Sequence, residues 1–155
     1  MPERVSKEVV VGVPVAAFWA VIADYARYAE FVPGIHGCRV VRTGEGGVKE
    51  VEYDLDLGVK RVKYVLRHVE EPPRRMAWSL ASGDLMKVSN GSWELSEAPG
   101  GKTRARYTVE VQVAKPPFVP QAFIDKVTDE MTKVSLPRNL DAFKARAEKL
   151  AAGHA

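Results

Sequence analysis

The sequence predicts an α+β fold in which a curved antiparallel sheet of about seven strands wraps around a long C-terminal helix, with two short helices between the first and second strands. Changes in the hydrophobic period support this prediction. The period is two from Ile35 to Val113 and becomes helical after Pro116-Pro117. With 155 residues, the chain is expected to form one domain over residues 1–155 with a core of its own.

The N-terminal part of the chain predicts one strand followed by two short helices. Residues 5–11 are rich in β-branched side chains and are expected to form the first strand. Pro14 suits the first turn of a helix, because its missing N–H has no intrahelical partner there. Asp24 is placed to cap a second helix, which Pro33-Gly34 ends.

The middle of the chain predicts a meander of antiparallel strands. Short separators rich in glycine and proline divide it into segments of strand length. The expected strands are 36–43, 48–57, 60–70, 74–82, 86–96 and 103–113. Consecutive strands with such short connections pair as neighbours in an antiparallel sheet.

One hairpin fixes its own register. If Gly58-Val59 form a two-residue turn, every charged residue opposes an opposite charge and every apolar residue opposes an apolar one. The opposed pairs are Asp56–Arg61, Asp54–Lys63 and Glu50–Arg67 on one face, and Leu55–Val62, Tyr53–Tyr64 and Val51–Leu66 on the other. A slip of one residue destroys both patterns. The charged face is therefore expected to be outside.

A bulge is expected in the strand 86–96. Met86 and Val88 have one parity, whereas Trp93 and Leu95 have the other. A bulge near Gly91 brings all four side chains to the inner face.

The last part of the chain predicts a long helix over residues 120–150. Its apolar stripe contains Phe123, Val127, Met131 and Val134, and Pro137 is expected to kink or interrupt the helix around residues 133–137. The surface available to this stripe is the concave face of the meander. The predicted helix therefore crosses that face.

This order of elements resembles the START-like (helix-grip) superfamily, which includes polyketide cyclase/dehydrase proteins and coenzyme Q-binding proteins. The segments that carry the resemblance are VPVAAFWAVIADYARYAEFVPGIHGCRVV, GDLMKVSNGSWELSEAPGGKTRARYTVEV and SLPRNLDAFKARAEKL. The segment around Phe31-Val32-Pro33 is similar to the coenzyme Q-binding branch, but Gly34-Ile35 follows where that branch has tryptophan-cysteine. The resemblance implies a hydrophobic small molecule bound between the sheet and the C-terminal helix.

Aromatic and apolar residues of the expected inner face are the candidates for lining this site, and packing of the core is the alternative role for each. The candidate ligand-binding residues are Phe31, Val32, Tyr53, Tyr64, His68, Trp78, Val88, Tyr107, Phe123, Val127 and Met131. Tyr25 is expected to anchor the second short helix to the core, and Phe31-Val32-Pro33 to form part of the entrance.

Motifs for nucleophilic or metal chemistry are weak. Cys38 and His36 share strand parity, but a small buried thiol beside a surface imidazole is the simpler interpretation. No second cluster of cysteine or histidine completes a zinc site, and no cofactor is predicted. An aromatase/cyclase would, by resemblance, use arginine and tyrosine groups in the pocket, whereas Arg61, Lys63 and Arg67 are expected to face outward.

Three functions are compatible with these observations: a binder or carrier of a hydrophobic small molecule (lipid, quinone or polyketide-like), a polyketide aromatase/cyclase-like enzyme, or a module that contacts a ribosome, a respiratory complex or a membrane surface. A net charge of +3 is too small to indicate a nucleic-acid partner. Cys38 is the single cysteine, and no signal peptide or membrane-spanning run is evident, so a cytoplasmic location is expected.

Overall fold

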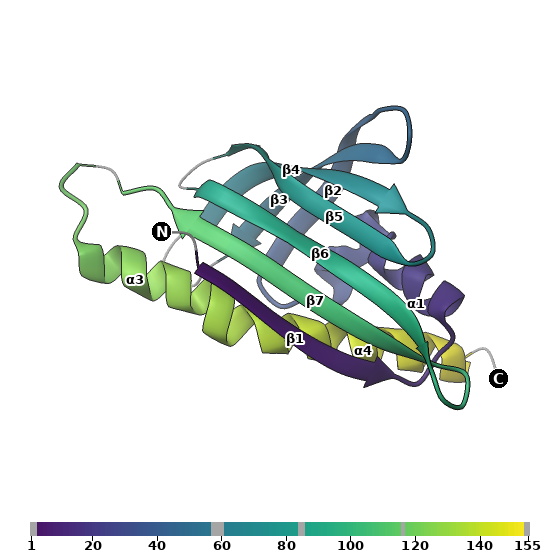
Figure 1. Ribbon diagram of the computed structural model, residues 1–155. Helices are drawn as coiled ribbons and strands as arrows, with labels where there is room; N and C mark the ends of the chain where they lie inside the picture. The colour runs from purple at the N-terminus through teal and green to yellow at the C-terminus, as the bar shows by residue number, and fades with distance from the viewer. Residues whose placement is uncertain (1–2, 57–60, 84–85, 116, 154–155) are drawn as a thin grey trace.

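A seven-stranded antiparallel sheet with a long helix along one face forms the centre of the molecule, as Figure 1 shows. The computed structural model describes residues 3–56, 61–83, 86–115 and 117–153. The strand order is β1-β7-β6-β5-β4-β3-β2. The strands are β1 (Glu3–Val11), β2 (Ile35–Thr43), β3 (Val48–Asp56), β4 (Arg61–Glu71), β5 (Arg75–Gly83), β6 (Met86–Ala98) and β7 (Lys102–Val113). The predicted α+β architecture and meander are confirmed.

Short helices connect the two edge strands, as the sequence predicts. They are α1 (Val15–Ile22), the 3₁₀ turn η1 (Tyr25–Arg27) and α2 (Tyr28–Phe31). Pro14 occupies the N-cap of α1 rather than its first turn. Asp24 precedes η1, but its side chain makes no capping hydrogen bond and pairs with Arg27 at 3.2 Å instead.

The register of the β3–β4 hairpin is confirmed pair by pair. Tyr53 faces Tyr64 and Asp54 faces Lys63, as the charge and apolar patterns predict. Arg61, Lys63 and Arg67 of β4 are exposed on the outer face. The shortest ion pair is diagonal, from Arg61 to Asp54 at 2.6 Å. The predicted turn at Gly58-Val59, together with residues 57 and 60, lies outside the described residues.

The prediction of a bulge near Gly91 is wrong. Gly91 pairs regularly with Val109, and the irregularity lies between Met86 and Val88. Because the bulge comes before Ser89, the alternation of inward and outward side chains is shifted by one residue from there on. Ser89 therefore faces inward, and Val88 pairs with Gln112 on the outer side.

The C-terminal helix is continuous but irregular. It consists of α3 (Gln121–Asp129), the π-helical turn η2 (Glu130–Val134) and α4 (Ser135–Gly153). Pro137 accounts for the irregularity, because it lacks the N–H for the preceding turn and its ring crowds the carbonyl four residues earlier. The π turn also shifts the phase of the stripe, so that Thr132 is buried and Val134, predicted to belong to the apolar stripe, is exposed. None of the helices in the described part of the chain is long and apolar enough to cross a membrane.

The densest part of the core lies between α1, the sheet and the middle of α4. Trp93 is its centre, with Tyr107 stacked at 4.4 Å and the rings of Phe18 and Phe143 edge-on at 5.4 and 5.2 Å. Thr103 supplies a hydrogen bond across this region, donating to the carbonyl of Val13 at 2.7 Å. This packing leaves the other part of the concave face to the site described next.

Candidate functional site

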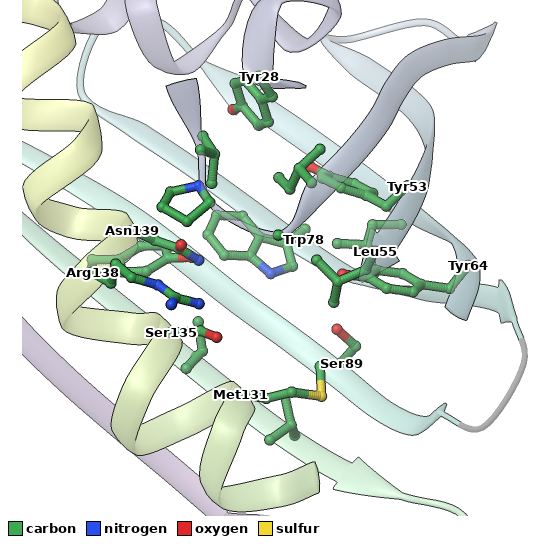
Figure 2. A pocket seen from close by; sticks show the side chains of 18 of the residues that line it. Tyr28, Tyr53, Leu55, Tyr64, Trp78, Ser89, Met131, Ser135, Arg138 and Asn139 are labelled. Carbon is green, nitrogen blue, oxygen red and sulfur yellow. The ribbon is translucent and has the colours of Figure 1, made fainter. Parts of the chain in front are cut away.

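A cavity of about 110 Å³ lies between the concave face of the sheet and the C-terminal helix. Figure 2 shows its two walls, with the strands carrying Tyr53, Tyr64 and Trp78 on one side and the helix carrying Met131 and Arg138 on the other. The short segment after α2 also contributes to the lining. The site therefore lies where the predicted fold places it.

The wall formed by the sheet is largely aromatic. Tyr53 and Tyr64 stack on neighbouring strands, with ring centroids 5.4 Å apart. Trp78 lies 5.9 Å from Tyr107, which in turn packs on Trp93 in the core. The wall of the cavity is thus continuous with the core and is held rigidly by it.

Two glycines make room for the rings of this wall. A Cβ on Gly91 would lie 2.3 Å from the indole of Trp78 and 2.6 Å from the carbonyl oxygen of Thr108. A Cβ on Gly83 would lie 2.2 Å from the Cβ of Tyr64. Each glycine is the strand partner of the aromatic residue that lies against it. A larger residue at position 91 would displace the ring of Trp78, and one at position 83 would displace the backbone of Tyr64.

A tyrosine–histidine pair lines the cavity. The hydroxyl of Tyr53 is 2.8 Å from Nε2 of His68, which is 2% exposed. Burial, with a smaller contribution from the positive charge of Lys49, lowers the pKa of His68 to about 3. The pKa of Tyr53 is raised by burial. At neutral pH this pair is therefore uncharged.

The wall formed by the helix is more polar. Ser135, Arg138 and Asn139 face the cavity in Figure 2. Arg138 also pairs with Glu130 at 3.5 Å near the surface. Burial raises the pKa of Tyr107 to about 12, although a hydrogen bond with Asn139 opposes the shift. This wall brings hydrogen-bonding groups to an otherwise apolar space.

The structure brings seven of the predicted residues to the cavity and leaves four away from it. Val32, Tyr53, Tyr64, His68, Trp78, Tyr107 and Met131 line the cavity. Phe31, Val88, Phe123 and Val127 are not among its lining residues. Ligand binding by any of them stays a prediction.

The four residues outside the lining have other surroundings. Phe31 packs behind the wall, with its ring 5.2 Å from Phe143 and the guanidinium of Arg146 at 5.1 Å from its centroid. Val127 is buried in the core and Phe123 is half-buried against it. Val88 lies on the outer side because of the bulge before it. Of the predicted entrance, Val32 and Pro33 line the cavity.

Sequence reasoning missed most of the polar lining. The inward orientation of Ser89 can be predicted only if the bulge in β6 is placed correctly, between Met86 and Val88. The helical wall had a usable signal, because Met131, Ser135, Arg138 and Asn139 follow a helical repeat that continues to Phe143. A search restricted to apolar stripes passes over polar residues on the same face.

The other candidate chemistry is not assembled at this site. Burial raises the pKa of Cys38 to about 12, so its thiol is protonated at neutral pH, and His36 is exposed. Within the described ranges, no three histidine, cysteine or acidic side chains are grouped so as to hold a metal ion. Arg67 lies on the outer face with the other basic residues of β4.

Comparison with solved structures defines the class of this fold. The aromatase/cyclase Zhui from Streptomyces sp. R1128 matches with a TM-score of 0.79 and 18% sequence identity, over 96% of this chain and 95% of that one. A START superfamily protein from Mycobacterium smegmatis matches with a TM-score of 0.77 and 20% identity, over 95% and 98% of the two chains. The protein TTHA0849 from Thermus thermophilus has a TM-score of 0.81 and 18% identity, over 97% and 99%.

The chain is thus a helix-grip protein of the START-like (SRPBCC) superfamily. Within it, the chain belongs to the family described as polyketide cyclase / dehydrase and lipid transport, which matches residues 2–148. A search of curated proteins finds no match.

Proposed function

We propose that this protein binds a hydrophobic small molecule in the cavity between the sheet and α4. The observation that carries the proposal is the cavity of about 110 Å³ with a wall of tyrosine and tryptophan rings. Protein interiors are close-packed, so a space of this size beside a well-packed core is a feature that a ligand can use. The family description, which includes lipid transport, supports the same class of ligand.

Binding is favoured over catalysis by the protonation states of the inner wall. His68 is neutral at physiological pH, and burial raises the pKa of Tyr53, Tyr64 and Tyr107. General acid–base catalysis is most efficient when the pKa of the group lies near the working pH. The pKa of His68 lies below that range and the pKa values of the three tyrosines lie above it. All four side chains therefore stay uncharged at neutral pH and act as neutral hydrogen-bonding groups.

The test fills the cavity and compares ligand content. Val109→Phe places a larger side chain on a residue that lines the cavity, and Val88→Phe makes the same change on the outer face of β6. Native mass spectrometry and organic extraction of protein from its own host are expected to show a bound ligand in the wild type and in Val88→Phe. The ligand is expected to be lost from Val109→Phe. Equal ligand content in the two variants, or an empty wild type that also binds no added quinone or fatty acid, contradicts the proposal.

A second candidate function is a polyketide aromatase/cyclase-like enzyme. The hydrogen-bonded Tyr53–His68 pair at the cavity favours it, because such a pair can position a substrate carbonyl and pass a proton. Deletion of the gene in its host is then expected to change the pattern of aromatic products, and a gene carrying His68→Phe should fail to restore it. An unchanged product pattern after deletion contradicts this function and leaves the binding proposal intact.

A further inference from the structure

Besides Nδ1 of the buried His68, three hydrogen-bonding groups of the sheet wall have no side-chain partner within the described residues. They are the hydroxyls of Tyr64 and Ser89 and the indole N–H of Trp78, here called the donor cluster, and all three residues line the cavity. Tyr64 and Ser89 are 8% and 6% exposed. Among the residues that the structure describes, none of the three groups makes a side-chain hydrogen bond. In Figure 2 the Tyr64 hydroxyl and the Trp78 nitrogen point toward the space between the sheet and the helix.

The donor cluster is held in place by the sheet. Trp78 on β5 pairs with Gly91, and Ser89 lies two residues from Gly91 on the same face of β6. Tyr64 is fixed by its stack on Tyr53 and by its close approach to Gly83. The geometry of the three groups is therefore set by backbone pairing and ring packing.

The chemistry of the cluster selects one kind of ligand atom. An indole N–H can only donate a hydrogen bond, and a hydroxyl can donate or accept. On the helical wall Arg138 likewise only donates. The lining also contains acceptors, among them Asp56, which is exposed at the end of β3, and Oδ1 of Asn139 on the helical wall, which is buried without a partner in the described chain. An acceptor is therefore the one kind of ligand atom that all three groups of the donor cluster can hydrogen-bond.

The size of the cavity limits the part of the ligand that fits inside. An apolar cavity of about 150 Å³ engineered in another protein binds benzene. The cavity of about 110 Å³ described above is smaller, so at most about one ring fits inside it. A larger ligand has to extend through the mouth, where Arg138 is half-exposed.

We propose that the cavity recognises a single ring that bears an acceptor oxygen, a ketone or a carboxylate, and that the donor cluster hydrogen-bonds this oxygen. The inference rests on the proposed binding function and adds the polarity of the ligand to it. The groups of the donor cluster make no side-chain hydrogen bond within the described residues, so an acceptor supplied by the ligand contributes to its affinity. A purely apolar ring of the same size lacks this contribution.

The test uses three probes of similar size: toluene, acetophenone and benzoate. Calorimetric titration of the wild type is expected to give affinities for acetophenone or benzoate at least tenfold higher than for toluene. Tyr64→Phe and Ser89→Ala each remove one hydroxyl without adding bulk, and each is expected to weaken binding of the preferred oxygen-bearing probe about fivefold. Binding of toluene should be unchanged, and Ser92→Ala on the same strand is the matched control. If the wild type binds benzoate more tightly than acetophenone and Arg138→Gln abolishes this difference, the ligand oxygen belongs to a carboxylate. If the wild type binds acetophenone more tightly, the ligand oxygen belongs to a ketone.

The possible failures are distinguishable. If the three probes bind equally well, or if the two variants lose toluene and the oxygen-bearing probes alike, the acceptor inference is wrong while the binding function stands. If none of the three probes binds, the acceptor inference is wrong. The comparison of ligand content between Val109→Phe and Val88→Phe then decides whether the proposed binding function holds.

Discussion

The packed core and the cavity are built from the same residue types but differ in how their polar atoms are satisfied. In the core region, Tyr25 donates a hydrogen bond to Glu70 at 2.5 Å, and Thr103 donates to Val13 at 2.7 Å. In the cavity, Tyr64 and Ser89 are also buried residues, at 8% and 6% exposure, but their hydroxyls make no side-chain hydrogen bond within the described part of the chain. An aromatic ring on the inner face is therefore a poor guide to function by itself. A polar atom bonded to another protein group indicates a packing role, whereas one without such a partner indicates a role in ligand recognition.

The largest effect is expected from removing the centre of the core. Trp93→Ala deletes a ring that is 2% exposed and contacts Phe18, Tyr107 and Phe143. We expect a loss of about 3–5 kcal/mol in the free energy of unfolding, measured by chemical denaturation. Trp19→Ala, which removes a half-buried tryptophan from α1, is the control and should cost less. Equal losses contradict the assignment of Trp93 as the centre of the core.

Gly91→Ala should disturb the cavity through the sheet. The new methyl group meets both the indole of Trp78 and the backbone oxygen of Thr108, so the ring has to move. We expect a loss of about 3 kcal/mol in stability, toward the upper end of the usual range for overpacking, together with weaker ligand binding. In Gly37→Ala the methyl group lies 3.8 Å from Asp54, and little change is expected. Normal stability and ligand affinity in Gly91→Ala contradict the close fit between Gly91 and Trp78.

The buried His68 should make stability depend on pH. Its pKa falls from 6.5 to about 3 in the folded protein, mainly through burial. Between these two values the unfolded chain binds more protons than the folded one. The contribution of His68 is therefore complete above pH 6.5 and is lost as the pH falls toward 3, by at most about 1.4 kcal/mol per pH unit.

The measurement compares unfolding free energies between about pH 7 and pH 4.5 for the wild type and two variants. His68→Gln should reduce the decline in stability over this interval. His36→Gln changes an exposed histidine and should leave the decline as in the wild type. Identical pH dependence in all three proteins contradicts a neutral, buried His68.

The sequence was sufficient for the fold and for most of the sheet wall, because both depend on periodicity. The hairpin register followed from charge and apolar pairs that tolerate no slip, and it placed Tyr53, Tyr64 and His68 on one face. An irregularity before Pro137 followed from the missing N–H of proline, but it is a π turn at Glu130–Val134 rather than an interruption at residues 133–137.

The errors have local physical causes that periodicity does not contain. A bulge can satisfy the same apolar pattern at several positions, so Val88 was assigned to the face that Ser89 occupies. The π turn changed the phase of the helix, which exposed Val134 and buried Thr132. Polar atoms without partners are visible only after the fold is assembled, and these atoms carry the inference about the ligand.

The smallest predicted effect is a difference between two conservative substitutions. Tyr25→Phe removes the donor to Glu70, whose side chain is 9% exposed and keeps its ion pair with Lys49 at 3.1 Å. We expect a loss of about 1.5–2 kcal/mol, because a hydrogen bond to a charged group is lost and a buried carboxylate oxygen loses its donor. Tyr64→Phe removes a hydroxyl without a partner in the described chain, so its stability should stay within about 0.5 kcal/mol of the wild type while its affinity for an oxygen-bearing ring falls. Thermal or chemical unfolding without ligand measures both. A larger loss for Tyr64→Phe than for Tyr25→Phe would show that the Tyr64 hydroxyl is satisfied within the folded protein and is not reserved for a ligand.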